Sequence, residues 1–203
     1  MKVLIVSGGI GSGKSTVCRM LESDYGFPVY EADRRVKELY HEHPSLLSDI
    51  EDSFGLSFRD AKGVFQPSLM AARIFSDPEA LQKVESMVFP VLTEDFADWK
   101  HMNADKEYAV LESATILEKP ALTGLGDVVI VVDAPLEQRI ERAVARDGIS
   151  ADKVLDRIRT QKMMNRISAG EIPAEVDYVL KNDGSLPELS GSLHELVDNL
   201  IVK

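Results

Sequence analysis

The sequence contains a single cysteine, Cys18, so the chain cannot form a disulfide bond within itself. It also lacks a long apolar run. The first hydrophobic stretch, Val3–Val6, is far shorter than the ~20 residues of a membrane-spanning helix, and it is too short for the core of a signal peptide. We therefore expect no membrane association and a cytoplasmic location, where thiols stay reduced.

Positive charge is also scarce. Lysine and arginine number 23 against 34 acidic residues, which gives a formal net charge of −11. Nucleic acids and anionic membranes bind basic surfaces, so this balance argues against both as partners. The length of 203 residues, with 44% hydrophobic and 28% charged residues, fits one folded domain with insertions. Nothing in the sequence calls for an obligate protein partner.

Short apolar runs alternate with helical patterns along the chain. The predicted strands are Val3–Val6, Pro28–Tyr30, Tyr108–Glu112, Val128–Val132 and Tyr178–Leu180. Helical patterns follow at Lys14–Asp24, Asp33–Tyr40, Pro135–Asp147 and Leu186–Val202. This order predicts an α/β fold of three layers around a parallel five-stranded sheet.

Two insertions interrupt this alternation. Helical periodicity between the second and third strands covers Ser45–Phe54, Ser68–Phe75 and Pro78–Trp99. Pro90 should kink or divide the last of these helices, because proline removes a helical hydrogen bond. We expect a helical insertion at 61–103 and a second insertion, rich in basic residues, at 147–174. The nucleotide-binding core of the single domain 1–203 would then consist of 1–60, 104–146 and 175–203.

A glycine-rich segment follows the first predicted strand. Gly8–Ser15 matches the pattern G-x-x-x-x-G-K-[ST] and leads directly into a helix, as a phosphate-binding loop does. Its glycines allow backbone N–H groups to surround phosphate oxygens. Lys14 would bind the β- and γ-phosphates of ATP, and the Ser15 hydroxyl would ligate Mg²⁺. The residues expected to bind the nucleotide here are Gly9, Gly11, Ser12, Gly13, Lys14, Ser15 and Thr16.

The rest of the chain discriminates among phosphate-loop proteins. A guanine-specific switch carries Asn-Lys-x-Asp, but the nearest segment here, Lys181–Gly184, has a different order. An ATP-driven machine usually has a hydrophobic strand that ends in two acidic residues, whereas Tyr108–Leu111 ends in Glu112 alone. A small-molecule kinase therefore fits best.

A kinase needs a carboxylate near the transferred phosphoryl group. Asp33 follows the second strand, and the carboxyl ends of parallel strands converge on the ligand crevice. Asp33 could equally be the N-cap of the helix Arg34–Tyr40. The residues alone leave these two interpretations open.

Arg142 and Arg146 lie four residues apart and Arg139 lies three residues before Arg142, so they share one face of a predicted helix, where they could contact the triphosphate. The alternative is a surface helix on which these arginines pair with Glu137 and Glu141. Glu118, after the third strand, could orient substrate or a Mg²⁺-bound water, or it could be a solvated loop carboxylate.

Several motifs together resemble the dephospho-coenzyme A kinase family over essentially the whole chain. They are Gly8–Thr16, Pro28–Asp33, Arg73–Phe75, Glu112–Glu118, Ile130–Asp133 with Gln138 and Arg142, Ile158–Gln161, and Asp177–Gly184. The resemblance implies a phosphate-loop kinase fold. It also implies transfer of the γ-phosphoryl group of ATP to the ribose 3′-hydroxyl of dephospho-CoA, which gives CoA and ADP in the last step of CoA synthesis.

The resemblance also assigns roles to residues. Asp33 would be the catalytic base, assisted by Lys14 and Arg142, and Asp33, Arg34 and Glu118 would contact the substrate. The insertion 61–103 would bind the substrate, and 147–174 would form a lid.

The chain departs from the family pattern in three places. Phe89-Pro90 replaces His-Pro, Ala114-Thr115-Ile116 replaces Pro-Leu-Leu, and an arginine is missing around Pro67. All three departures lie on the acceptor side. They leave open a kinase of another small hydroxyl compound or nucleoside monophosphate, and a nucleotide-binding regulator without turnover.

Overall fold

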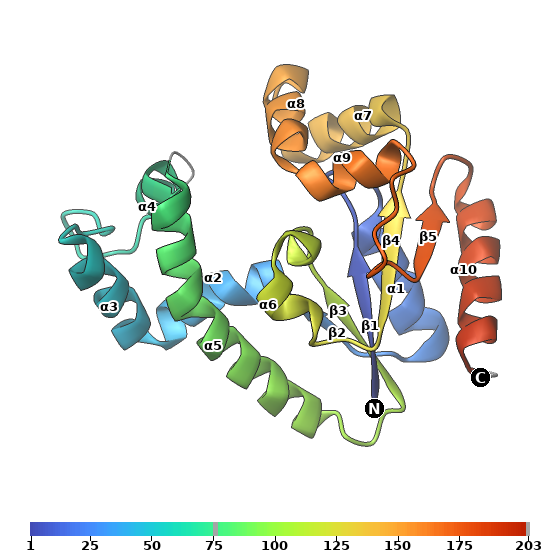
Figure 1. Cartoon of the computed structure of the whole chain (residues 1–203), viewed down its shortest axis with the longest axis horizontal. Helices are drawn as coiled ribbons and strands as arrows, with labels where there is room; N and C mark the ends of the chain where they lie inside the picture. The colour runs from blue at the N-terminus through green and yellow to red at the C-terminus, as the bar shows by residue number, and fades with distance from the viewer. Residues whose placement is uncertain (75–76, 202–203) are drawn as a thin grey trace. The chain divides into compact units, whose positions relative to one another are not determined.

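The fold was analysed in a computed structural model, which describes residues 1–74 and 77–201 (Figure 1). The strands are β1 (Lys2–Ser7), β2 (Val29–Glu31), β3 (Tyr108–Glu112), β4 (Val128–Asp133) and β5 (Tyr178–Lys181). The helices are α1 (Lys14–Tyr25), α2 (Ala32–Glu42), α3 (Pro44–Phe54), α4 (Pro67–Ile74), α5 (Pro78–Met102), α6 (Pro120–Thr123), α7 (Leu136–Asp147), α8 (Ala151–Thr160), α9 (Lys162–Ser168) and α10 (Leu186–Ile201), with a 3₁₀ turn η1 (Ile116–Glu118). Within the described ranges, no helix is long and apolar enough to cross a membrane.

The strands form one sheet in the order β2-β3-β1-β4-β5, and every pairing is parallel. This confirms the predicted α/β fold with its five-stranded parallel sheet. Glu112 of β3 lies opposite Val6 of β1 on one side and opposite Glu31 of β2 on the other. The three strands therefore end in one row, and the segments that follow them leave the sheet at the same edge.

Both faces of the sheet are buried, which explains why the strands are apolar at successive positions. Leu4, Val6 and Ile130 belong to a core that also contains the inner sides of α1 and α10 (Figure 1). Alternate residues such as Ile5 and Val131 point to the opposite face and are at most 1% exposed. The sheet is thus the middle of three layers.

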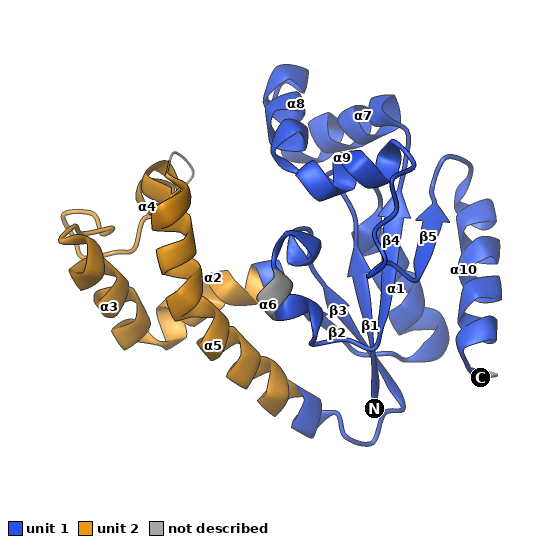
Figure 2. Cartoon of the chain, viewed as in Figure 1, with its two compact units in different colours: residues 1–33, 100–203 blue, residues 34–99 orange. Residues whose placement is uncertain are grey.

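The chain divides into two compact units (Figure 2). The first contains residues 1–33 and 100–203, and the second contains residues 34–99. The second unit begins well before the expected boundary at 61, because α3 and the end of α2 share a core with α4 and α5. Leu47 and Ile50 of α3, for example, belong to the same buried cluster as Val84 and Val88 of α5.

Helix α5 runs from Pro78 to Met102 without a break, so of the two predicted effects of Pro90, a kink or a division, the division is wrong. Its buried residues recur every four positions, at Ala80, Val84, Val88, Leu92 and Phe96. Burial of this continuous apolar stripe outweighs the one hydrogen bond that proline removes. The predicted helix ends at Phe75 and Val202 lie outside the described residues.

The core beneath the sheet can be tested with two identical substitutions in α10. Leu193 is fully buried, whereas Leu186 is 63% exposed. We expect Leu193→Ala to lower the free energy of unfolding by about 2–5 kcal/mol, because it leaves a cavity. Leu186→Ala should change it by less than about 0.5 kcal/mol. Urea unfolding measures both values, and equal losses would contradict the described packing.

Candidate active site

Neighbouring segments pack closely against the glycines of the loop after β1. Gly11 and Gly13 adopt positive φ values of 74° and 103°, which favour glycine. A Cβ atom on Gly11 would lie 2.0 Å from the carbonyl oxygen of Arg139, and one on Gly13 would lie 2.2 Å from Nδ2 of Asn182. The loop needs glycine at these positions because α7 and the end of β5 press against it from outside.

Arg139 of α7 supports the loop as a buried cation. It is only 2% exposed, and its Nε donates a hydrogen bond of 3.1 Å to the carbonyl oxygen of Ile10. Gln161 joins this arrangement, since its Oε1 accepts bonds from the backbone N of Ile10 at 3.0 Å and from Arg139 at 3.4 Å. Burial lowers the pKa of Arg139, and the negative charge of Asp133 acts in the opposite direction. The tip of the loop is therefore tied to both α7 and the α8–α9 junction.

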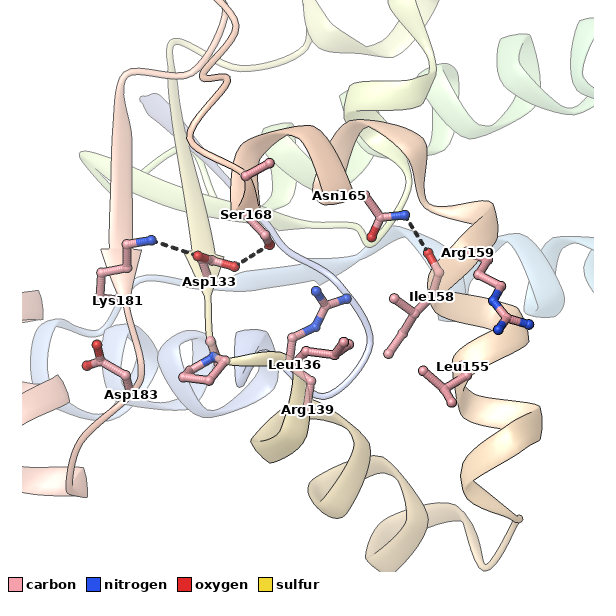
Figure 3. Close-up of a pocket in the computed structure, with 13 residues that line it drawn as sticks. Asp133, Leu136, Arg139, Leu155, Ile158, Arg159, Asn165, Ser168, Lys181 and Asp183 are labelled. Carbon is pink, nitrogen blue, oxygen red and sulfur yellow. Dashed lines mark hydrogen bonds and ion pairs between the residues drawn. The ribbon is translucent and has the colours of Figure 1, made fainter.

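A hollow of about 660 Å³ lies beside this arginine, between the ends of β4 and β5 and the helices α8 and α9 (Figure 3). The Arg139 side chain points into it between Asp133 and Ile158. Asp133 accepts hydrogen bonds from the Ser168 hydroxyl at 2.7 Å and from Nζ of Lys181 at 2.8 Å. These contacts hold the α9 end of the segment 147–174 against the sheet.

Asn182 connects the loop to Arg142. The side-chain Nδ2 of Asn182 donates to the carbonyl oxygen of Ser12 at 2.7 Å. The main-chain carbonyl oxygen of Asn182 accepts two bonds of 3.3 Å from the Arg142 guanidinium. Arg142 also donates to Gln138 at 2.8 Å. Arg146 instead pairs with Asp147 at 2.7 Å and is mostly exposed. These bonds of the two arginines therefore go to partners other than Glu137 and Glu141, the partners expected for a surface helix.

Lys14, in the first turn of α1, reaches the acidic end of β3. Its Nζ lies 3.7 Å from Oε1 of Glu112, and these two side chains are only 11% and 13% exposed. Burial raises the pKa of Glu112, Lys14 lowers it, and the nearby Asp33 and Glu31 raise it further. The lysine of the loop therefore lies among carboxylates at the row where β1, β2 and β3 end.

Asp33 lies at the same row. Helix α2 begins at Ala32, so Asp33 lies within its first turn and is not the N-cap that we considered as an alternative. Its Oδ1 accepts a hydrogen bond of 3.0 Å from the Ser113 hydroxyl, and its Oδ2 accepts one of 3.0 Å from the backbone N of Ala114. The structure thus brings this carboxylate to the end of β3, next to the strand that carries the loop.

The remaining hydroxyls of the loop differ in their surroundings. Ser15 is exposed at the start of α1, and Oγ1 of Thr16 accepts a 3.3 Å bond from Arg19. Ser12 is 1% exposed, and its hydroxyl has no hydrogen-bond partner among the described residues. A buried hydroxyl without a partner is costly by about 1–3 kcal/mol, so this position favours a polar ligand.

Two predicted substrate-binding residues have contacts of their own. Oε1 of Glu118 accepts a 2.6 Å bond from the backbone N of Met163, in the first turn of α9, so that carboxylate oxygen stabilises the start of a helix. Arg34 follows Asp33, belongs to the second unit, pairs with Glu38 at 3.4 Å and is largely exposed. Their substrate role stays a prediction.

Three contacting residues had no role predicted from the sequence, namely Ser113, Gln161 and Asn182. Asn182 carried a usable signal, because it is the first polar residue after a strand whose carboxyl end meets the crevice. Arg139 was expected on the helix face that contacts the triphosphate, but the structure buries it against the loop, where its Nε bonds to the carbonyl oxygen of Ile10. Gln161 lies between two helices and Ser113 follows a strand, and hydrophobic periodicity predicts no contacts for residues in such connections.

A glycine loop at the first strand, a lysine beside it and a carboxylate at a neighbouring strand end define a phosphate-loop kinase fold. The sequence profile of the dephospho-CoA kinase family matches residues 2–188, and the chain belongs to that family. The dephospho-CoA kinase of Chlorobaculum tepidum is 36% identical, over 97% of this chain and 93% of the relative. That of Porphyromonas gingivalis is 37% identical, over 77% and 76%.

A solved structure shares the fold of the whole chain. A protein of Thermus thermophilus superposes with a TM-score of 0.81 at 29% identity, covering 98% of this chain and 97% of that one. The family resemblance inferred from the motifs is confirmed by the profile match and by the two relatives.

The geometry of the loop predicts a sharp difference between two glycines. Gly11→Ala should weaken ATP binding at least about tenfold, because its Cβ would collide with backbone that cannot move independently. Gly191 in α10 has open space around its Cα, so Gly191→Ala should bind ATP as the wild type does. Calorimetric titration with ATP measures both, and equal affinities would contradict the described loop.

Proposed function

We propose that this chain transfers the γ-phosphoryl group of ATP to the ribose 3′-hydroxyl of dephospho-CoA, which gives CoA and ADP. The observation that carries the proposal is the position of Asp33. Two hydrogen bonds hold its carboxylate at the end of β3, directly beside the strand that carries the phosphate loop. Membership in the dephospho-CoA kinase family supports the acceptor.

In the proposed reaction, Asp33 accepts the proton of the acceptor hydroxyl. The hydroxyl oxygen forms a bond to the γ-phosphorus, the bond from phosphorus to the bridging oxygen breaks, and ADP leaves. Lys14 and Arg142 neutralise charge that develops on the phosphate oxygens. The backbone N–H groups of Gly9, Gly11 and Gly13 hold the phosphates in place, and Arg146 contacts the triphosphate from the end of α7.

The residues of the loop fit Mg²⁺ bound together with a nucleotide. Among the described residues, no three His, Cys, Asp or Glu side chains group to hold an ion. Mg²⁺ typically takes one or two protein oxygens and completes its shell with phosphates and water. The exposed hydroxyl of Ser15 can supply such an oxygen. When bound, the ion would neutralise charge on the β- and γ-phosphates.

The other parts of the chain complete the proposal. Residues 61–103 of the helical insertion, with Arg34 and Glu118, would bind the acceptor, and 147–174 would act as a lid that excludes water. The enzyme would work in the cytoplasm on a small molecule, without nucleic acid, membrane or obligate protein partner.

The proposed base predicts a specific loss. Asp33→Asn should lower kcat by about 10²–10⁴-fold, because an amide cannot accept the proton, while the affinity for ATP changes little. Asp105 is an exposed aspartate near the end of α5, and Asp105→Asn serves as the matched control. The measurement is dephospho-CoA-dependent release of ADP. A wild type that binds ATP but ignores dephospho-CoA would refute the acceptor and leave the nucleotide site intact.

The metal dependence gives a second prediction for the reaction. Removal of divalent cations with a chelator should abolish ADP release, and added Mg²⁺ should restore it. Ser15→Ala should require about tenfold more Mg²⁺ for half-maximal rate, because a ligand oxygen is lost. Unchanged Mg²⁺ dependence in that variant would contradict the role of Ser15.

A further inference from the structure

Ser113 connects two parts of the site that come from different strands. It follows β3 and is only 3% exposed. Its backbone N donates a 3.2 Å hydrogen bond to the carbonyl oxygen of Val6, near the end of β1. Its hydroxyl donates a 3.0 Å bond to Oδ1 of Asp33. Ser113 therefore links β1, the strand that carries the phosphate loop, to the carboxylate of Asp33.

The direction of the hydroxyl bond is set by a third contact. The backbone N of Thr115 lies 3.3 Å from Oγ of Ser113 and can only donate. The hydroxyl oxygen therefore accepts from Thr115, and its own proton is directed to Asp33. Because the Ser113 side chain is buried, water competes little for either bond.

Ala114 supplies the second donor. Its backbone N bonds to Oδ2 of Asp33 at 3.0 Å, so each carboxylate oxygen is held by one of two successive residues. Two donors fix the rotation of the carboxylate about its bond to Cβ. Ala114 stands where the family pattern has the proline of Pro-Leu-Leu. A proline has no backbone N–H, so this chain gains the donor through that departure.

The position of Asp33 in the chain makes this arrangement significant. Asp33 is the last residue of the first unit, and α2 continues from it into the second. All the contacts of its carboxylate described above lie within the first unit. The carboxylate is thereby fixed to the same sheet as the loop.

We propose that Ser113, with the N–H of Ala114, is a positioning residue that holds the Asp33 carboxylate in register with the phosphate loop. This rests on the proposed function, in which Asp33 is the base. Phosphoryl transfer depends on such placement, because small displacements of reacting groups can lower rates by about 10²-fold.

The test compares Ser113→Ala with Ser113→Thr, which keeps the hydroxyl. We expect Ser113→Ala to lower kcat about tenfold, with KM for ATP changed less than about twofold. Ser113→Thr should restore most of kcat, because it keeps the donor to Asp33, and Ser23→Ala, at an exposed serine of α1, should match the wild type.

Ala114→Pro tests the second donor while Ser113 remains, and it decides the question if Ser113→Ala does not fold. It should also lower kcat with little change in KM for ATP. An unchanged kcat in these variants, beside an inactive Asp33→Asn, would overturn the positioning role and leave the base in place. A fall in kcat that Ser113→Thr does not restore, or that an equal rise in KM for ATP accompanies, would show a merely structural effect and would also overturn it. An active Asp33→Asn would instead refute the base itself, and the proposal with it.

Discussion

The parallel pairing of β1 with β3 is the constraint on which the site depends. It places Val6 opposite Glu112, and β2 adds Glu31 to the same row. The phosphate loop follows β1, Ser113 follows β3 and Asp33 follows β2, all within two residues of that row. Their mutual positions are therefore set by backbone hydrogen bonds in the middle of the sheet, and side-chain contacts refine them.

Charge is distributed unevenly in this acidic chain. The phosphate loop is surrounded by a buried arginine, Arg139, and by Lys14 paired with Glu112. Burial of charged groups is costly unless they are paired or hydrogen-bonded. Here the cost is offset by the bond of Arg139 to the carbonyl oxygen of Ile10 and by the pairing of Lys14 with Glu112. Two cations therefore lie at the loop, although the net charge of the chain is −11.

Much of this organisation could be predicted from the sequence, because the signals are local. Hydrophobic runs predict the five strands, and the spacing of glycines with Lys14 predicts the loop. Helical periodicity predicts the helices of the second unit, but the start of that unit at Arg34 could not be predicted, because it depends on side chains such as Leu47 and Val84 that meet only in the folded chain. The partners of Asp33 were missed for the same reason, since residues 33 and 113 are brought together by strand pairing. The lid, the Mg²⁺ ligand and the substrate contacts remain predictions.

As the proposed base, Asp33 accepts a proton and never becomes phosphorylated, so the phosphoryl group passes directly from ATP to the acceptor. The stereochemical course at the γ-phosphorus tests this most directly. ATP made chiral at that phosphorus with oxygen isotopes would be turned over with dephospho-CoA, and the configuration of the product phosphate determined. A single in-line transfer predicts inversion. Retention would require a covalent phosphoenzyme with two transfers, and it would contradict the role given to Asp33.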